Sequence, residues 1–512
     1  GRRSSRGKII LACKRASLQM QGYAQTYGDV EKGHLAAPLT QNYQTSDGGQ
    51  AQQPRREQSS GFRDPVFLLL FLATAAGCTA YGLTSGLSAI QDVTSDSSDS
   101  SSSADIDSES VKKIAIMGVV LAAVASIMTS GVLGFLMRNA EGLIRTTLVM
   151  NIFLTGLFAL LAFANGLIWV AFVCLLFTLL NWCYMRAVQS RIPFASANLK
   201  VACAAVKEHW GVVFVSYAAV VKGVLWGAVV FLCAVGAYNA NTTQQTDEYD
   251  SSTTTTVVSD NFYTVMFLLC IAGNWGQEVI KNVSHVTTAG AVASWWYDPA
   301  RSSVVSGAYC RATTTSLGSV AFGSLIVAFI QALKSAAERA ERSNDGAAFF
   351  ACIARCLLQC LQDVVEYFNR WAFVYVGVYG DSFIQSGKAV MRLFKERGWT
   401  AIINDSLIQR TLSLLALAVA CAGAGVGALL PWMTGTYLDS VSTDGTALAY
   451  GLACLGFVVS LVLSLIMVSV VDSAVATVFV CAAEAPQALE QNHPAHFYDF
   501  VSAWRKAHQI QF

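Results

Sequence analysis

The chain has 512 residues, of which 54% are hydrophobic and only 13% are charged. Soluble domains carry about twice that charged fraction, so the composition excludes an ordinary soluble protein and indicates a polytopic membrane protein. The 34 basic and 33 acidic residues nearly cancel. This balance offers no basic surface for nucleic acid, and the lipid bilayer is the partner that the composition predicts.

The N-terminal residues 1–63 are polar and contain many arginines and lysines. Such a segment cannot bury a core and lacks a signal-peptide layout, so we predict a disordered cytosolic tail. Residues 64–485 hold about ten apolar runs long enough to cross a bilayer. We therefore predict an all-α polytopic membrane protein with about ten transmembrane helices, both termini cytosolic, and a cytosolic C-terminal tail over residues 486–512.

The expected spans follow one another with polar breaks between them. They lie at 65–90, 114–137, 143–164, 167–184, 211–238, 262–296, 313–334, at a stretch ending near residue 394, and at 412–432 and 447–480. The polar loops 91–112 and 239–260 are expected on the extracellular or lumenal face. The segment 192–206 is amphipathic and is expected to lie along the inner membrane surface. A second amphipathic segment, 347–368, is expected to continue into the eighth span.

Small residues recur at helical spacing in two of these spans. In the span 313–334 they are Ser319, Gly323, Ser324, Ala328 and Ala332. Helices associate closely in lipid where such residues face one another, so this span is predicted to be a central packing helix. Gly423 and Gly427 form a GxxxG pair in the ninth span, and we interpret it as a packing motif as well.

Four segments of the C-terminal half carry a more specific signal. They are W-x-x-E with TTAGAVASWWY within 275–297, LGSVAFGSLIVAFIQ at 317–331, NRWAFVYVGVYGDSFIQSGKAVMRLF at 369–394, and VVDSAVATVFVCAAEAP at 470–486. In this order they resemble the choline transporter-like proteins, solute carrier family 44, and most of all the fungal Pns1-type members. The N-terminal half resembles the family only in layout. The resemblance implies a ten-helix carrier of choline, with ethanolamine as an alternative cargo and proton exchange as a further option, in the plasma membrane or an organelle membrane.

A choline-like substrate constrains the chemistry of its site. A quaternary ammonium donates no conventional hydrogen bond, so it is bound by aromatic faces, with a carboxylate adding attraction. The candidates for an aromatic site near the membrane midplane are Tyr217, Trp226, Trp275, Tyr375 and Tyr379, with Glu278 as the carboxylate. Aromatic side chains also pack the cores of helix bundles, and that interpretation stays open for each of the five.

Ionisable residues inside spans form the second set of candidates, because charge within a bilayer is costly and often functional. They are Lys222, Glu278, Lys281, His285, Asp381 and Asp472. Lys222 and Lys281 are equally good ion-pair partners for Glu278 by height and by helical spacing. Each pair is interpreted either as structural support or as a switch that frees Glu278 for a cation or a proton.

The remaining motifs are weak. Asn241 begins an Asn-Thr-Thr sequon, which predicts glycosylation if its loop is extracellular or lumenal. We find no phosphate-binding loop, no nucleophile elbow and no zinc spacing, so the sequence predicts no enzyme, no cofactor and no metal site. The alternative to a carrier is a non-transporting subunit or scaffold that binds protein partners through its polar tails. A pore is the third option.

Overall fold

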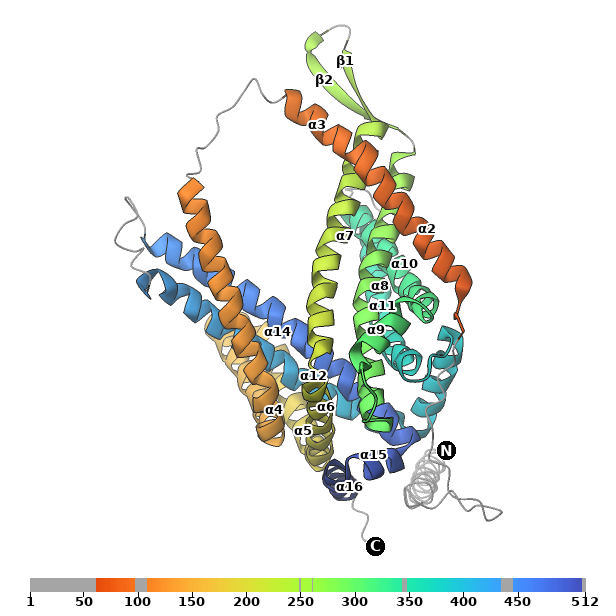
Figure 1. Cartoon of the computed structure of the whole chain (residues 1–512). Coiled ribbons are helices and arrows are strands. Elements are labelled where there is room, and N and C mark those ends of the chain that lie inside the picture. Colours follow the sequence, from red (N-terminus) through yellow and green to blue (C-terminus); the bar gives the residue numbers. More distant parts are fainter. Residues whose placement is uncertain are drawn as a thin grey trace, which may run out of the picture.

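The computed structural model describes residues 61–96, 108–247, 250–259, 261–342, 348–433 and 445–508. Most of the predicted N-terminal tail and part of the loop 91–112 lie outside these residues. The described chain forms a tilted bundle of long helices (Figure 1), which confirms the all-α polytopic class. The elements in the first half are α2 (Pro65–Tyr81), the π-helical turn η1 (Gly82–Gly86), α3 (Leu87–Asp96), α4 (Ser108–Ala164), α5 (Ile168–Val188), the 3₁₀ turn η3 (Gln189–Arg191), α6 (Ile192–Glu208) and α7 (Gly211–Asn241).

The second half begins with the strands β1 (Thr242–Asp247) and β2 (Asp250–Val258). The helices that follow are α8 (Phe262–Tyr297), α9 (Val304–Thr313), α10 (Leu317–Arg342), α11 (Ala348–Tyr379), α12 (Phe383–Met433), α14 (Gly445–Glu484), α15 (Pro486–Asn492) and α16 (Pro494–His508). The two strands form an antiparallel hairpin within the loop 239–260, where the sequence predicts only a polar loop. This hairpin is a local departure from the otherwise helical fold.

Eight helical stretches in the described residues are long and apolar enough to cross a membrane, so the chain is a multi-pass integral membrane protein. One of them, Ile116–Ala164 in α4, covers both the second and the third expected spans. The two spans meet at a kink at Asn139, where the backbone is non-helical with φ −121° and ψ 18°. The helix α8 is absent from the eight because polar residues interrupt its apolar surface, yet its 36 residues are long enough to cross. With α8 and the second segment of α4, the ten expected crossings are accounted for.

The helix α10 occupies the predicted central position, between α8, α11 and α2. Its small residues Ser319, Gly323, Ser324, Ala328 and Ala332 are all buried. A Cβ added to Gly323 would lie 2.4 Å from the ring of Phe383, so only glycine allows that ring to approach. The prediction of a packing helix is therefore confirmed. The GxxxG prediction is confirmed too, because a Cβ on Gly427 would lie 2.1 Å from the Leu452 carbonyl oxygen of α14.

One sequence prediction about helices is wrong, and the structure adds to a second. The expected eighth span does not run on to Phe394, because α11 ends at Tyr379 and α12 begins at Phe383. Gly380 between them has φ 71°, a left-handed conformation that glycine adopts without strain and that interrupts a helix. The segment 192–206 is more buried than an amphipathic surface helix would be, and its position along the inner membrane surface stays a prediction. As α6 it is mostly buried among α4, α14 and α16, and its many small side chains permit this close packing.

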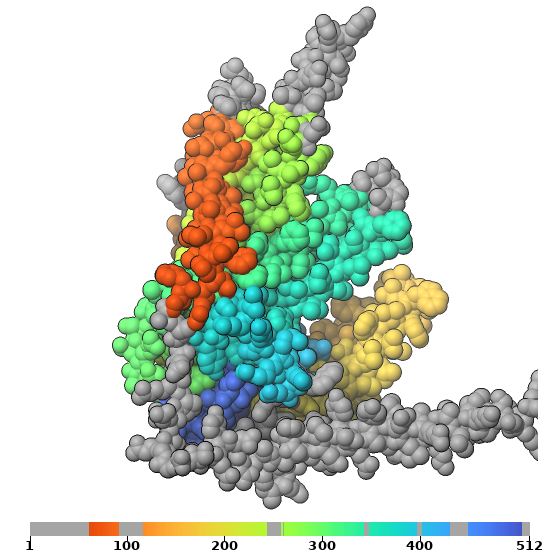
Figure 2. Space-filling model, turned by 90° about the vertical axis from the view of Figure 1, so that its right-hand side faces the viewer, coloured from red at the N-terminus to blue at the C-terminus, as the bar shows by residue number. Residues whose placement is uncertain are grey.

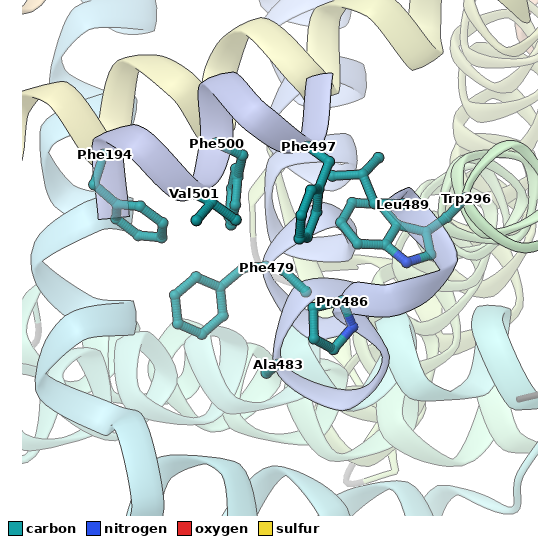
Figure 3. A pocket seen from close by; sticks show the side chains of 10 residues that line it. Phe194, Trp296, Phe479, Ala483, Pro486, Leu489, Phe497, Phe500 and Val501 are labelled. Carbon is teal, nitrogen blue, oxygen red and sulfur yellow. The ribbon is translucent and has the colours of Figure 1, made fainter. Parts of the chain in front are cut away.

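The C-terminal helices α15 and α16 cover the ends of α6, α8 and α14. Figure 3 shows Phe497 and Phe500 of α16 facing Phe479 of α14, with Trp296 of α8 beside them. The gap between these side chains has a volume of about 10 Å³, which is room for a water molecule at most. This region is thus an apolar docking surface for the end of the chain and has no space for an organic ligand.

Candidate functional site: a polar cavity within the bundle

A cavity of about 320 Å³ lies between five helices of the bundle and is partly open to the surroundings. This volume falls within the range of small-molecule sites in proteins. The lining residues are Glu278, Lys281, Asn282 and His285 of α8, Val327 of α10, Asp363, Glu366, Tyr367, Asn369, Arg370 and Phe373 of α11, Gln409 of α12, and Ser469 and Asp472 of α14. The charged residues of α8, together with Asn282 and His285, therefore face this space.

The charge of the lining is negative. Four carboxylates, those of Glu278, Asp363, Glu366 and Asp472, stand against two basic side chains, Lys281 and Arg370, which leaves a net charge of −2 when His285 is neutral. A cleft lined mainly by charge of one sign raises the local concentration of ions of the opposite sign. The cavity therefore favours a cationic ligand over an anionic one.

Glu278 is the carboxylate at the α8 wall, with only 10% of its side chain exposed. Its oxygens accept hydrogen bonds from Lys281 Nζ and from Gln331 Nε2 of α10, with the nearest Lys281 contact at 2.8 Å and the Gln331 contact at 3.2 Å. Asn282 Nδ2 lies 3.5 Å from Glu278 and donates to Ser324 Oγ of α10 at 2.9 Å. Of the two partners that the sequence left open for Glu278, the structure thus has Lys281.

Arg370 of α11 links the helices on the opposite side of the cavity. Its two Nη atoms bind both oxygens of Asp405 in α12, at 2.5 and 3.0 Å, and its Nε lies 3.1 Å from Oδ2 of Asp472 in α14. The guanidinium side chain is 13% exposed, and Asp405 is 3% exposed. Oδ1 of Asp472 is buried and has no hydrogen-bond partner among the described residues. Asp405 is therefore bound to Arg370 through both of its oxygens, whereas Asp472 is bound to it through one.

Backbone contacts hold the rest of the lining in place. His285 Nε2 donates to the Arg370 carbonyl oxygen at 3.0 Å, so this predicted residue faces the cavity beside the arginine. Asn369 Nδ2 donates to the Gly323 carbonyl oxygen of α10 at 2.9 Å. Ser473 Oγ of α14 donates to the His285 carbonyl oxygen at 3.1 Å. These bonds fix α8, α10, α11 and α14 relative to one another at the level of the cavity.

The aromatic members of the lining are Tyr367 and Phe373, both on α11. Tyr367 stacks on Phe394 with ring centroids 6.1 Å apart, which holds its ring in one orientation. Phe373 is buried and packs against Phe383 at 5.7 Å. Tyr367 is partly exposed and is the ring that a cation in this cavity would reach first, whereas Phe373 lies deeper in the wall.

None of the five aromatics predicted from the sequence is among the residues lining the cavity. Trp275 donates to the Ala321 carbonyl oxygen at 2.9 Å, and Trp226 to that of Gly273 at 3.0 Å, so both indoles join neighbouring helices. Tyr217 packs on the outside of the core. Near the end of α11, the Tyr375 hydroxyl donates to Glu484 at 2.8 Å. The Tyr379 hydroxyl lies 3.2 Å from the hydroxyl of Tyr297 at the end of α8. The structure brings these residues to helix contacts and does not gather them into one aromatic site.

Three other candidates also lie apart from the cavity. Lys222 is on the outer surface of α7, where its Nζ donates to the Tyr309 hydroxyl of α9 at 2.5 Å. Asp381 lies in the break between α11 and α12. Burial raises the pKa of its carboxyl above the ordinary value, and nearby Arg63 only partly offsets this effect. Asn241 ends α7, and its Nδ2 donates to the Ala237 carbonyl oxygen at 2.8 Å. Its glycosylation stays a prediction.

Sequence reasoning missed the residues that α11 contributes. Asp363, Glu366, Arg370 and Phe373 lie at helical spacing, three or four residues apart, and this pattern puts them on one face. The stripe was detectable as a charged face within an otherwise apolar helix. Asp405 gives no such signal, because only the fold brings it to Arg370, 35 residues earlier in the chain.

Comparisons with known proteins agree with this arrangement. Residues 172–487 match the family described as "Plasma-membrane choline transporter". The chain is similar to the Protein PNS1 of Mycosarcoma maydis, with 27% identity over 94% of this chain and 91% of that protein. It is also similar to the Protein PNS1 of Debaryomyces hansenii, with 27% identity over 92% of this chain and 94% of the relative.

A relative outside the fungi shows the same likeness. A CTL-like protein of Dictyostelium discoideum is 27% identical over 72% of this chain and 62% of that protein. The matched family region runs from within α5 to the start of α15 and so includes all five helices that line the cavity. From the bundle architecture and the extent of this match, the chain belongs to the plasma-membrane choline transporter family.

Proposed function

We propose that the chain carries choline or a closely related small organic cation, with ethanolamine as the alternative cargo, across the membrane by alternating access. The observation that carries the proposal is the partly open cavity of about 320 Å³ between five helices, with a net charge of −2 and aromatic side chains in its lining. Membership of a choline transporter family supports the same class of function. The plasma membrane is the proposed location, and we assign no catalytic step to the chain.

The ion pair in the cavity suggests how a cation would be received. Lys281 is 56% exposed, whereas Glu278 is 10% exposed, so the lysine is the mobile partner of a fixed carboxylate. An entering ammonium group would replace Lys281 at Glu278 and leave the charge balance of that wall unchanged. The rings of Tyr367 and Phe373 would then face the methyl groups of a quaternary ammonium. We further propose a proton as the coupling ion, because His285 and Asp472 line the same space.

The proposal is tested with purified protein in liposomes, where uptake of radiolabelled choline should saturate. Glu278→Gln should lower kcat/KM by about tenfold or more, since it removes the charge that offsets the substrate's charge. Tyr367→Leu should raise KM by about fivefold, while Tyr367→Phe keeps the aromatic face and should stay near the wild-type value. Glu141→Gln, which breaks an exposed pair with Arg145 on α4, is the matched control for loss of one carboxylate.

The scaffold alternative makes a different prediction. A non-transporting subunit would show no saturable uptake, no rise in Tm with choline or ethanolamine, and co-purification with a stoichiometric partner protein. Uptake that persists unchanged in Glu278→Gln would remove this carboxylate from the mechanism. Ion currents that do not saturate would indicate a pore.

A further inference from the structure

The residues immediately before α2 reach into the break between α11 and α12. The Arg63 backbone N–H donates to the Thr315 carbonyl oxygen at 2.9 Å, and its Nε donates to the Gly380 carbonyl oxygen at 3.3 Å. Asp64 Oδ2 accepts from Ser319 Oγ of α10 at 2.7 Å and from the Phe383 backbone N–H of α12 at 2.9 Å. We refer to Arg63 and Asp64 as the clasp. In Figure 2 the red start of α2 lies against the cyan segment, which agrees with these bonds.

Three backbone features fit this contact. Asp64 has φ 49° and ψ 53°, a left-handed conformation that non-glycine residues adopt only where the surroundings stabilise it. A Cβ on Gly318 would lie 2.2 Å from the Arg63 carbonyl oxygen, so the clasp approaches α10 where there is no side chain. Gly380, also left-handed, turns its carbonyl oxygen toward Arg63. The clasp is therefore a specific, closely packed contact with α10 and with the break between α11 and α12.

Asp64 serves as a cap for a helix that begins 319 residues later. The first N–H groups of a helix have no partner within it, and a negative charge near them is favourable. Within α12, Ser382 Oγ accepts from the Gln385 N–H only at 3.4 Å, while Asp64 accepts from the Phe383 N–H at 2.9 Å. The stronger part of the cap thus comes from another helix, and losing it would free the start of α12.

The position of the clasp relates it to the cavity. Phe383, whose backbone Asp64 holds, packs its ring against Phe373, which lines the cavity. Gly380 lies seven residues beyond Phe373, or about 10 Å along the bundle axis, toward the end of α11 that lies beside the end of α8. The clasp therefore joins α10, α11 and α12 at the end of the bundle where α2 starts. The sequence predicts that this end is cytosolic. We call this the inner end.

We propose that Asp64 is a positioning residue of the transport cycle, which keeps the inner end closed by holding the start of α12 against α10. Opening the cavity to the inner end then requires the Phe383 N–H and Ser319 Oγ to leave Asp64. This inference rests on the proposed function for its meaning in transport, but the closure itself is measurable without any substrate.

Ser386 of α12 provides a reporter, because it is fully buried and its Oγ has no hydrogen-bond partner among the described residues. Ser386→Cys is labelled with a membrane-impermeant maleimide in inside-out and right-side-out vesicles, and the peptide with residue 386 is quantified by mass spectrometry, so that native cysteines do not interfere. Adding Asp64→Ala should speed labelling from the inner end by about tenfold, as expected for a lost charge-assisted cap. Asp64→Asn should give a smaller rise, and Glu141→Gln should match the parent.

Each outcome decides the proposal. Equal labelling rates in folded, monodisperse Asp64→Ala, Asp64→Asn and parent proteins would overturn it. If Asp64→Ala does not fold, Asp64→Asn and Ser319→Ala, which removes one donor to Asp64, take its place with the same expectation. In liposomes, Asp64→Ala should change kcat at least threefold and leave KM within twofold, because it does not touch the cavity. Faster labelling of Asp64→Ala, in a protein whose parent shows no choline uptake, would support the closure and contradict the proposed cargo. Normal choline uptake with labelling that Asp64→Ala leaves unchanged would support the cargo and contradict the closure.

Discussion

At the scale of single residues, Arg370 shows why charges persist inside this bundle. Its guanidinium is nearly buried, and it is shared between Asp405 and Asp472, which belong to two other helices. A buried ion pair adds little net stability over an apolar pair, but removing one partner leaves an uncompensated charge in a poorly polarisable interior. Arg370 therefore has a structural role whether or not the substrate contacts it.

Arg370→Met should destabilise the protein strongly, by about 3–5 kcal/mol, because it leaves Asp405 buried and unpaired. The measurement is thermal unfolding of the purified protein. Adding Asp405→Asn should recover much of the loss, since it removes the unpaired charge. Arg145→Met, which breaks an exposed pair, is the control and should leave Tm nearly unchanged. A decrease no larger than that of the control would show that the buried pair contributes nothing.

The sequence predicts part of the site at this scale. Glu278, Lys281, His285 and Asp472 all line the cavity, because charged and polar groups within a membrane helix are costly unless they face such a space. The five predicted aromatics do not line this cavity, for a different reason. Aromatic residues also join helices, as Trp275 does, and their position along a span does not reveal the direction in which the ring points.

At the scale of helices, the contact between α12 and α14 depends on glycine. Gly427 faces the Leu452 backbone and Gly423 faces Ser460, with no room for a methyl group at either position. Gly425, two residues from each, has open space around its Cα. The two faces of the same helix turn therefore differ in what they tolerate.

Gly427→Ala should lower the stability by about 1–3 kcal/mol, because the new Cβ would meet a backbone oxygen that cannot rotate away. Gly425→Ala should be neutral or slightly stabilising, since alanine favours the helix and meets nothing. Thermal unfolding of the two variants in one detergent provides the comparison. Equal Tm values would mean that the α12–α14 contact relaxes at no cost.

Periodicity of small residues predicts that Gly423 and Gly427 pack against a neighbouring helix and that α10 is central, but it does not identify α14 as the partner. It was not enough to place the break at Gly380, since glycine is common inside membrane helices and the sequence does not show which one is left-handed. The burial of α6 was also beyond its pattern. An amphipathic helix has the same signature whether its apolar face meets lipid or, as here, other helices.

At the scale of the whole molecule, the C-terminal helices join α8 and α14 to α6 through contacts that include histidine. His493 stacks on Trp295 with centroids 3.8 Å apart, and Trp295 Nε1 donates to Glu208. Burial and neighbouring His493 lower the pKa of His496, against the opposing effects of Asp499 and Glu208. Burial also lowers the pKa of His209, which Glu208 partly offsets.

Acidification should therefore loosen α15 and α16. A histidine with a lowered pKa binds its proton more readily when undocked, so docking keeps its full stability above the ordinary pKa near 6.5 and loses it as the pH falls below that value. Hydrogen exchange over residues 486–503, corrected for intrinsic rates, should show less protection at pH 5.5 than at 7.5. His496→Gln should reduce this difference. Identical protection at both pH values would exclude the effect.

The polarity of α8 has a consequence for topology assignment in relatives. The polar residues that α8 contributes to the cavity make this crossing less lipid-like, and apolarity alone does not find it. A hydropathy survey that omits one crossing changes the parity of the count, and every later loop is then assigned to the opposite compartment. Epitope mapping of any homologue should therefore begin from the segment that corresponds to residues 262–297.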